Sequence, residues 1–149
     1  MKGEVGMENH CDLQITVAEW EVMRVVWSLR TVSSKQVSLI LTNKMNWKPA
    51  TTKTLIGRLV RKGILSTKTD GKRFIYAATI SEEECIKFQV NKLLSTICNK
   101  SIGTALANAI TEYELSSDDI VLIKNKLEKK IQSKIACECV PEECECRNH

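Results

Sequence analysis

Residues 48–63 read KPATTKTLIGRLVRKG, and this stretch decides the fold expected for the N-terminal half of the chain. Pro49 suits the first turn of a helix, where its missing N–H is not needed, and Gly63 falls where a C-terminal cap is expected. Apolar residues recur at Ala50, Leu55, Leu59 and Val60. The other faces carry Thr51, Thr52, Lys53, Thr54 and Arg58. The stretch therefore predicts an amphipathic helix with a polar, partly basic outer surface.

Two capping boxes lie upstream of this helix. In each, an N-cap hydroxyl and a Glu or Gln three residues later satisfy two backbone N–H groups. The first begins at Thr16 and the second at Ser33. The apolar stripes that follow consist of Trp20, Met23, Val26 and Trp27, and of Val37, Ile40 and Leu41. The pattern predicts two more helices, the second ending near Asn43. Three short helices joined by tight breaks are typical of a helix-turn-helix unit.

Two β-rich runs come next, over residues 64–69 and 72–77. They flank Asp70-Gly71, a dipeptide that favours the positive φ angles of a type I′ turn, so a hairpin is predicted. Three helices followed by a hairpin are the element order of a winged helix. We therefore expect a mainly α fold with a small β-hairpin. Its winged helix-turn-helix domain is expected over residues 13–80, after a flexible tail over residues 1–12.

Positive charge is concentrated in this expected domain. The chain has 149 residues and a net charge of +4. Nine basic residues lie between Lys44 and Arg73, where Asp70 is the only acid, so this segment carries +8 and the rest of the chain −4. Lys and Arg displace counterions from phosphates and so supply affinity for DNA. A merely solvated basic surface is the alternative, but the charge coincides with the helix, turn and wing signals, which favours double-stranded DNA as a partner.

The candidate base-reading residues lie in the first turns of the 48–63 helix. Lys53 can donate to guanine O6 and N7, and the neighbouring threonines can donate, accept or touch the thymine methyl group. Arg58 is better placed for a phosphate, and Lys72 and Arg73 for the backbone or minor groove. The predicted DNA-binding residues are Lys48, Thr51, Lys53, Thr54, Arg58, Lys72 and Arg73. The three tryptophans are expected to pack between helices rather than to stack on bases.

Helical patterning resumes after Thr79. A third capping box begins at Ser81, and Ser116 to Asp119 starts the last helix. The apolar positions are Ile86, Val90, Leu93, Leu94 and Ile97, then Ile102, Leu106, Ala109, Ile110 and Tyr113, and finally Ile120, Ile123, Leu127, Ile131 and Ile135. These helices are too few to bury their own apolar faces, so residues 81–136 are expected to form a homodimerisation domain. The alternative is that they fold back onto the first domain.

Four of the seven cysteines form a C-x-C-x4-C-x-C pattern within residues 137–149. The predicted metal ligands are Cys137, Cys139, Cys144 and Cys146. Four thiolates complete a tetrahedral Zn²⁺ site, and they are also soft ligands that select Cu(I). The alternatives are a disordered tail with reactive thiols, or disulfides between the two C-x-C pairs. Cys85 and Cys98 lie in apolar helical contexts and are expected to be small core residues.

Other classes of function fit the sequence less well. It lacks a P-loop, a Ser/His/Asp set and a C-x-x-C beside a βαβ pattern, so no enzyme is expected. No apolar run approaches the ~18–20 residues that span a bilayer, and the N-terminus has no signal-peptide core, so a cytoplasmic location without membrane contact is expected. A thiol-based redox-sensing repressor and a copper buffer or chaperone remain alternatives. The basic wing region would have no use in a buffer.

The stretches Trp20–Trp27, Trp47–Leu55 and Arg58–Gly63 resemble the penicillinase-repressor (BlaI/MecI) family. These bacterial winged-helix repressors dimerise through C-terminal helices, and the likeness covers residues 13–133. The paired C-x-C tail is similar to that of the copper-responsive branch, CopY. The resemblance implies a zinc-loaded dimer on a palindromic operator ahead of copper-export genes. It also implies that Cu(I), delivered by a copper chaperone, displaces zinc from the four cysteines and releases the DNA.

The sequence departs from the family pattern at two places. The β-lactam-responsive branch is cleaved at an Asn-Phe bond in its dimerisation helices, whereas the best match here is Asn108-Ala109. Ala50 stands where that branch often has a lysine. The first departure argues against a proteolytic switch, and the second means that the base contacts need not transfer.

Overall fold

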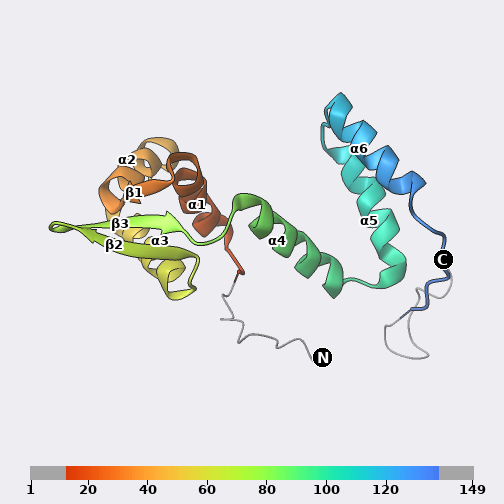
Figure 1. Cartoon of the computed structure of the whole chain (residues 1–149), viewed down its shortest axis with the longest axis horizontal. Coiled ribbons are helices and arrows are strands. Elements are labelled where there is room, and N and C mark those ends of the chain that lie inside the picture. Colours follow the sequence, from red (N-terminus) through yellow and green to blue (C-terminus); the bar gives the residue numbers. More distant parts are fainter. Residues whose placement is uncertain (1–12, 138–149) are drawn as a thin grey trace, which may run out of the picture. The chain divides into compact units, whose positions relative to one another are not determined.

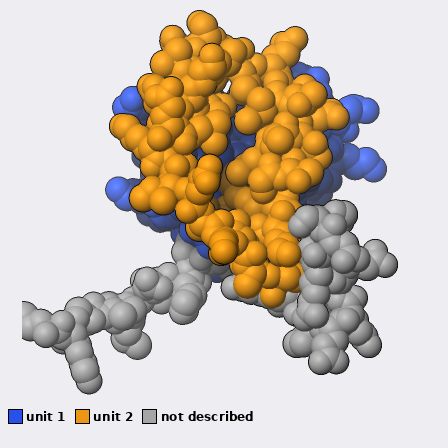
Figure 2. All heavy atoms as spheres, turned by 90° about the vertical axis from the view of Figure 1, so that its right-hand side faces the viewer, with its two compact units in different colours: residues 1–89 blue, residues 90–149 orange. Residues whose placement is uncertain are grey.

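The computed structural model describes residues 13–137. The chain divides into two compact units, Met1–Gln89 and Val90–His149 (Figure 2). The expected N-terminal tail lies outside the described residues, and so do three of the four predicted metal ligands, Cys139, Cys144 and Cys146. The helices and strands are labelled in Figure 1.

Three helices open the first unit: α1 (Val17–Leu29), α2 (Ser34–Met45) and α3 (Pro49–Arg61). Both expected capping boxes are formed. The hydroxyl oxygens of Thr16 and Ser33 accept from the backbone N–H three residues on, and a side-chain oxygen of Glu19 or Gln36 accepts from the backbone N–H of the N-cap residue. α2 runs two residues beyond Asn43 and ends where Asn46 takes a left-handed conformation with φ 56°. The helix-turn-helix prediction is therefore confirmed.

The end of α3 shows why Gly63 is needed there. Gly63 has a φ of 76°, a region that glycine enters without steric cost. Its N–H donates to the Val60 carbonyl, and the N–H of Ile64 donates to the Leu59 carbonyl, both at 3.0 Å. These two bonds form a Schellman motif, and the Leu59 and Ile64 side chains that accompany it are fully buried. The chain can thus leave α3 and enter the sheet directly.

The sheet has three antiparallel strands in the order β1-β3-β2: β1 (Thr31–Ser33), β2 (Leu65–Asp70) and β3 (Arg73–Ala78). The predicted hairpin is confirmed, and Asp70 pairs with Arg73 at its end. Its two-residue loop is Gly71-Lys72, and only Gly71 has a positive φ (62°). The turn is therefore of the type II′ kind rather than type I′. β1 was not predicted; it occupies a stretch that the sequence pattern assigned to a break between helices.

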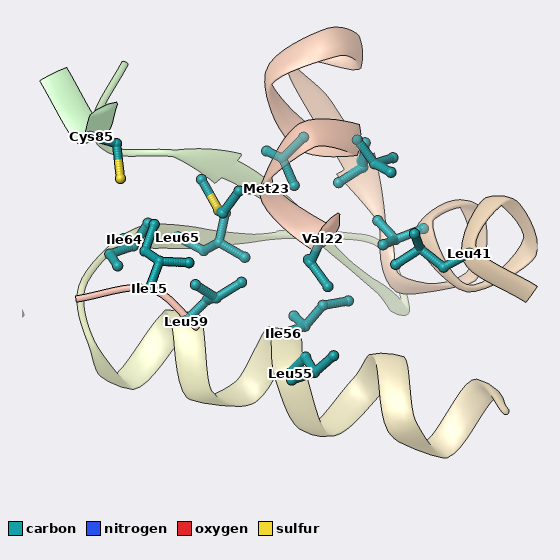
Figure 3. Packing of buried hydrophobic residues seen from close by; sticks show 14 residues of the cluster. Ile15, Val22, Met23, Leu41, Leu55, Ile56, Leu59, Ile64, Leu65 and Cys85 are labelled. Carbon is teal, nitrogen blue, oxygen red and sulfur yellow. The ribbon is translucent and has the colours of Figure 1, made fainter. Parts of the chain in front are cut away.

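One apolar core joins the three helices to the sheet (Figure 3). Val22, Met23, Leu41 and Leu59 are fully buried there. Cys85, near the start of the next helix, is also fully buried, as predicted. The tryptophans pack around this core: the rings of Trp20 and Trp27 meet edge to face with centroids 5.2 Å apart, and the Trp27 indole N–H donates to the Ile80 carbonyl at 3.0 Å. Their predicted packing role is confirmed.

The remaining helices are α4 (Glu82–Thr96), α5 (Asn99–Glu112) and α6 (Ser117–Glu128). The capping boxes at Ser81 and Ser116 are formed. The expectation that the last helix continues to Ile135 is wrong, because α6 ends at Glu128. Ile131 is 85% exposed, so the residues after Glu128 pack on no apolar surface of the described chain. Because packing supplies most of the stability of a helix, the sequence pattern alone does not extend α6 to Ile135.

The second unit buries none of its described side chains. Between residues 90 and 137 every side chain is at least partly exposed. Several large apolar side chains on α5 and α6 are 42–63% exposed, including Leu106, Ile110 and Ile120, and Tyr113, the C-cap residue of α5, is 74% exposed. Within residues 13–137, no helix is long and apolar enough to cross a bilayer.

Candidate nucleic-acid interface

The buried face of α3 separates the predicted site residues into those that can reach DNA and those that cannot. Thr52, Leu55, Ile56 and Leu59 face the core, at the i, i+3, i+4 and i+7 positions of one helical stripe. The inclusion of Thr52 among the polar-face residues is therefore wrong, since it is fully buried. Ala50, expected to face inward, is exposed instead. The buried stripe is rotated around the helix relative to the expected one, because it begins at Thr52 rather than Ala50. Thr52 carries a methyl group and so can occupy a position in the apolar core.

The outer face of α3 carries the other predicted residues. Lys48 is the N-cap residue, with an extended backbone and no side-chain capping bond. Thr51, Lys53 and Thr54 are exposed in the first turns. The Thr54 hydroxyl donates to the Ala50 carbonyl at 3.0 Å, so its lone pairs and methyl group are what it offers to a partner. Five of the seven predicted DNA-binding residues, the four named here and Arg58, are thus exposed on α3 and its N-cap position.

An open hollow of about 430 Å³ connects α3 with the hairpin. Lys53 and Val60 line it from the helix, and Thr67, Phe74 and Tyr76 line it from β2 and β3. Phe74 is 55% exposed. The helix and the hairpin therefore border one shared surface. Such a surface is suited to contacting a DNA groove and the phosphate backbone beside it at the same time.

The β2–β3 hairpin forms the wing and projects beyond the three helices (Figure 1). Lys68, Lys72 and Arg73 are exposed near its tip. Arg73 Nη2 lies 3.9 Å from Asp70 Oδ2, but both side chains are at least 70% exposed. Exposed pairs of this kind contribute little, so the Arg73 charge is available to an anionic partner.

Ion pairs divide the nine basic residues of the Lys44–Arg73 segment into two groups. Lys44 and Lys62 are held by carboxylates on α1: Lys44 Nζ lies 2.6 Å from Glu21 Oε2, and Lys62 Nζ 2.7 Å from Glu19 Oε2. The hydrogen bond from Lys44 lowers the pKa of Glu21 below its usual value. Apart from these two and Arg73, the other six form no ion pair with a carboxylate of residues 13–137: Lys48, Lys53, Arg58, Arg61, Lys68 and Lys72. The uncommitted charges lie on α3 and the wing.

The cysteines show one arrangement that sequence reasoning missed. Cys98 is the N-cap residue of α5 rather than a core residue, so that prediction is wrong. Its Sγ lies 3.5 Å from Sγ of Cys137, the one predicted metal ligand that the structure describes, and both residues are half-buried. No group of three or more potential metal ligands occurs within residues 13–137. Because 39 residues separate the two cysteines, no local sequence signal could pair them.

Comparison with known proteins identifies the family. The family described as penicillinase repressor matches residues 15–129. An uncharacterized 16.5 kDa protein of Latilactobacillus sakei is 42% identical over 136 residues, which cover 89% of this chain and 93% of that protein. The methicillin resistance regulatory protein MecI of Staphylococcus aureus is 31% identical over 118 residues, covering 78% of this chain and 95% of MecI.

A solved structure is similar to part of the chain. It is the solution structure of Bacillus licheniformis BlaI, in its monomeric form in complex with the blaP half-operator. The sequences are 35% identical, the match covers 48% of this chain and 87% of that one, and the TM-score is 0.44. MecI is a regulatory protein by name and the matching family is one of repressors, in agreement with the prediction that this chain is not an enzyme. With a family match over residues 15–129, the chain belongs to the penicillinase repressor family of DNA-binding transcriptional repressors.

Proposed function

We propose that this protein is a metal-responsive repressor of copper-homeostasis genes. As a zinc-loaded homodimer it binds a palindromic operator ahead of copper-export genes, and it leaves the DNA when Cu(I) replaces zinc. The observation that carries this proposal is the C-x-C-x4-C-x-C pattern of residues 137–146, joined in one chain to a winged-helix repressor body. Cytoplasmic location and delivery of Cu(I) by a copper chaperone belong to the same proposal.

Operator recognition is assigned to the exposed face of α3. Thr51, Lys53 and Thr54 meet base edges in the major groove, where lysine pairs with guanine and threonine can contact the thymine methyl group. Lys48 and Arg58 contact phosphates at the two sides of this reading face. Lys72 and Arg73 on the wing contact the neighbouring backbone or minor groove. The absence of carboxylate partners for most of these cations within residues 13–137 supports their assignment.

The dimer is assigned to the second unit. A single chain leaves the apolar side chains of α5 and α6 open to water, and a compact protein rarely exposes so many together. A second copy offers the same surface, so a two-fold axis lets each helix face cover its equivalent. Two copies also place two recognition helices on one DNA, which explains a palindromic operator.

The metal is assigned to the thiols of the chain end. Thiolates are soft ligands: four of them satisfy tetrahedral Zn²⁺, and they hold Cu(I) in preference to harder ions. Residues i and i+2 of an extended chain project to the same side, so a C-x-C spacing is suited to binding one metal ion through both sulfurs. Glu138, Glu142, Glu143 and Glu145 add negative charge that favours a cation. The donor set therefore fits both metals of the proposed exchange.

The test is operator binding under defined metal conditions. Fragments of copper-export promoters are titrated with the full chain carrying zinc, carrying Cu(I), or treated with a chelator. The expected result is binding with zinc and at least tenfold weaker binding with Cu(I). A control variant with Ser at Cys137, Cys139, Cys144 and Cys146 keeps the winged helix but is expected to lose the response to Cu(I). Equal binding of the wild-type protein in all three conditions would contradict the proposal and favour a redox-sensing or ligand-free repressor.

A further inference from the structure

We propose that Gln89 of α4 is a positioning residue for operator binding, because its side chain ties α4 to the C-terminal end of the recognition helix α3. The connection runs through residues 13–15, which we call the N-terminal strap. The proposal rests on the proposed operator recognition by α3. It does not depend on the metal response, since every residue that carries it lies outside the cysteine-rich end of the chain.

Two hydrogen bonds join Gln89 to the strap. The side chain of Gln89 is half-buried, and its Nε2 donates to the carbonyls of Leu13 and Ile15, each at 3.3 Å. A glutamine amide nitrogen carries two N–H groups, so one side chain can satisfy both carbonyls. The two partners lie 76 and 74 residues away in the sequence, so this contact belongs to the tertiary fold.

The middle carbonyl of the strap is bound by α3. The Gln14 carbonyl accepts from Nζ of Lys62, the C-cap residue of α3, at 2.7 Å. The strap also packs against the core, because Ile15 is only 8% exposed and lies in one cluster with Leu59 and Ile64 around the end of α3 (Figure 3). One short segment is therefore bound by α3 through its middle carbonyl and by α4 through the other two.

A second connection joins the end of α3 to the start of α4. The Thr79 hydroxyl donates to the Gly63 carbonyl at 2.6 Å, and the Thr79 N–H donates to the Ile64 carbonyl at 2.9 Å. Thr79 lies just before α4 begins, whereas Gln89 lies about two turns into the helix. Cys85, between them, is fully buried in the core. The first turns of α4 are thus held at several points, which fixes their direction relative to α3.

This arrangement matters because α4 extends past Gln89 as far as Thr96, from the first unit into the second, to which dimerisation is assigned. The directions of α3 and of the first turns of α4 are set together. In a dimer, that relation determines how the two recognition helices are presented to two half-sites. Loss of the Gln89 bonds would therefore leave each winged helix able to bind DNA, but would weaken the joint binding of both to a palindrome.

The test variant is Gln89→Glu, which keeps the length of the side chain but has no N–H to donate at neutral pH. Gln89→Met removes the same donors without adding a charge, so a change shared by the two variants reports the lost hydrogen bonds. The matched control is Asn91→Asp, the same change of amide to carboxylate at an exposed position of α4. Fluorescence anisotropy measures the affinity of each protein for a palindromic promoter fragment that binds the wild type, and for a duplex that carries one half-site. Far-ultraviolet circular dichroism and sedimentation report folding and dimerisation.

Both Gln89 variants are expected to bind the full operator roughly tenfold or more weakly than the wild type, because joint binding depends on the effective concentration of the second winged helix. Their half-site affinity, circular dichroism and sedimentation are expected to match the wild type, and the control is expected to match it throughout. Unchanged operator affinity in both variants would overturn the proposal. Equal losses on the operator and the half-site would also overturn it, since Gln89 would then act on the stability of the fold alone. A wild-type chain with no preference for the operator over unrelated DNA would overturn the proposed operator recognition and, with it, this proposal.

Discussion

The ammonium group of Lys62 lies 2.7 Å from Oε2 of Glu19, a carboxylate whose side chain is only 1% exposed. Lys62 is the C-cap residue of α3, and Glu19 completes the capping box of α1, where its Oε2 also accepts from Thr16 N–H. One lysine thus neutralises a buried charge and links the end of the recognition helix to the start of α1. It also donates to the Gln14 carbonyl at 2.7 Å. Part of the basic segment therefore holds the fold together rather than binding DNA.

Lys62→Met is expected to lower the free energy of unfolding by about 2–4 kcal/mol, because it leaves the Glu19 charge buried without its partner. Urea unfolding followed by tryptophan fluorescence measures this, since all three tryptophans lie in the first unit. Lys44→Met is the matched control: its pair with Glu21 has a half-exposed lysine, so a loss of no more than ~1 kcal/mol is expected. Equal losses in both variants would contradict the role assigned to Lys62.

Thr52→Val is expected to raise the free energy of unfolding by about 1 kcal/mol. Thr52 is fully buried, and its Oγ1 has no hydrogen-bond partner among the described residues, so the hydroxyl is desolvated without compensation. Valine keeps the shape and removes that cost. Operator affinity is expected to stay unchanged, because the side chain faces the core.

The control for this prediction is Thr54→Val on the exposed face of the same helix. Its hydroxyl donates to the Ala50 carbonyl, and exposed substitutions typically change stability by no more than ~0.5 kcal/mol. Its operator affinity is expected to fall instead. A destabilised Thr52→Val would show that the hydroxyl has a partner in solution.

The differences between sequence and structure have particular physical causes. Capping boxes and Gly63 act within one turn of the chain, so the starts of α1, α2, α4 and α6 and the end of α3 could be predicted. β1 could not, because a three-residue strand has no measurable alternation and depends on pairing with β3. The rotation of the α3 stripe onto Thr52 depends on packing against α1 and α2.

The candidate sites divide in the same way. Exposure of Lys53, Arg58 and the wing cations follows from local patterning and could be predicted from the sequence. The carboxylate partner of Lys62 lies 43 residues away, and the sulfur partner of Cys98 lies 39 residues away. Composition therefore revealed the charge and the thiols, but only the tertiary fold shows which charges are committed and which thiols meet.

Lys53→Ala and Lys72→Ala are expected to affect DNA binding in different ways. Lys53 is assigned to a base, so its loss lowers operator affinity by roughly tenfold, which is about 1.4 kcal/mol and lies within the ~1–3 kcal/mol of a base contact, with little change on unrelated DNA. Lys72 is assigned to the backbone, so its loss weakens binding to both DNAs and reduces the salt slope by about one. Gel-shift titrations at several salt concentrations measure both effects.

Lys124→Ala on α6 is the control for these two variants, since it removes one positive charge outside the winged helix. It is expected to change neither affinity nor salt slope appreciably. Unchanged operator binding by Lys53→Ala would remove α3 from base recognition.

The Ser116–Asp119 capping box predicts an acid-dependent stability of α6. Bonds from Ser116 Oγ and N–H to Asp119 Oδ2, at 2.6 and 3.0 Å, lower the pKa of Asp119 below its usual value of 3.8. A carboxylate with a lowered folded-state pKa stabilises the folded state fully above the unfolded value, and this contribution is lost as pH falls through the folded value.

The helical circular dichroism of Asp119→Ala is therefore expected to fall below that of the wild type above pH 3.8, and the two curves are expected to converge at lower pH. Glu112→Ala, which removes a carboxylate at the end of α5 that forms no capping bond within the described residues, serves as the control. A gap between Asp119→Ala and the wild type that does not narrow as the pH falls below 3.8 would contradict the assignment of the effect to the ionised carboxylate.

Ile110→Asp is expected to separate the proposed dimer. Ile110 is 45% exposed on α5 of a unit that buries no described side chain, so a partner copy must cover it if the dimer exists. A charge introduced at such a contact is desolvated on association, which weakens binding strongly. Sedimentation at micromolar concentration is expected to give a dimer for the wild type and a monomer for the variant, whereas Thr104→Asp, an exposed polar position on the same helix, should remain a dimer.

Two linked recognition helices bind a palindrome with a high effective concentration, so Ile110→Asp should lose at least tenfold affinity for the full operator and keep its affinity for a half-site. A wild-type protein that sediments with the mass of one chain would instead support the alternative in which the helices fold back onto the winged helix.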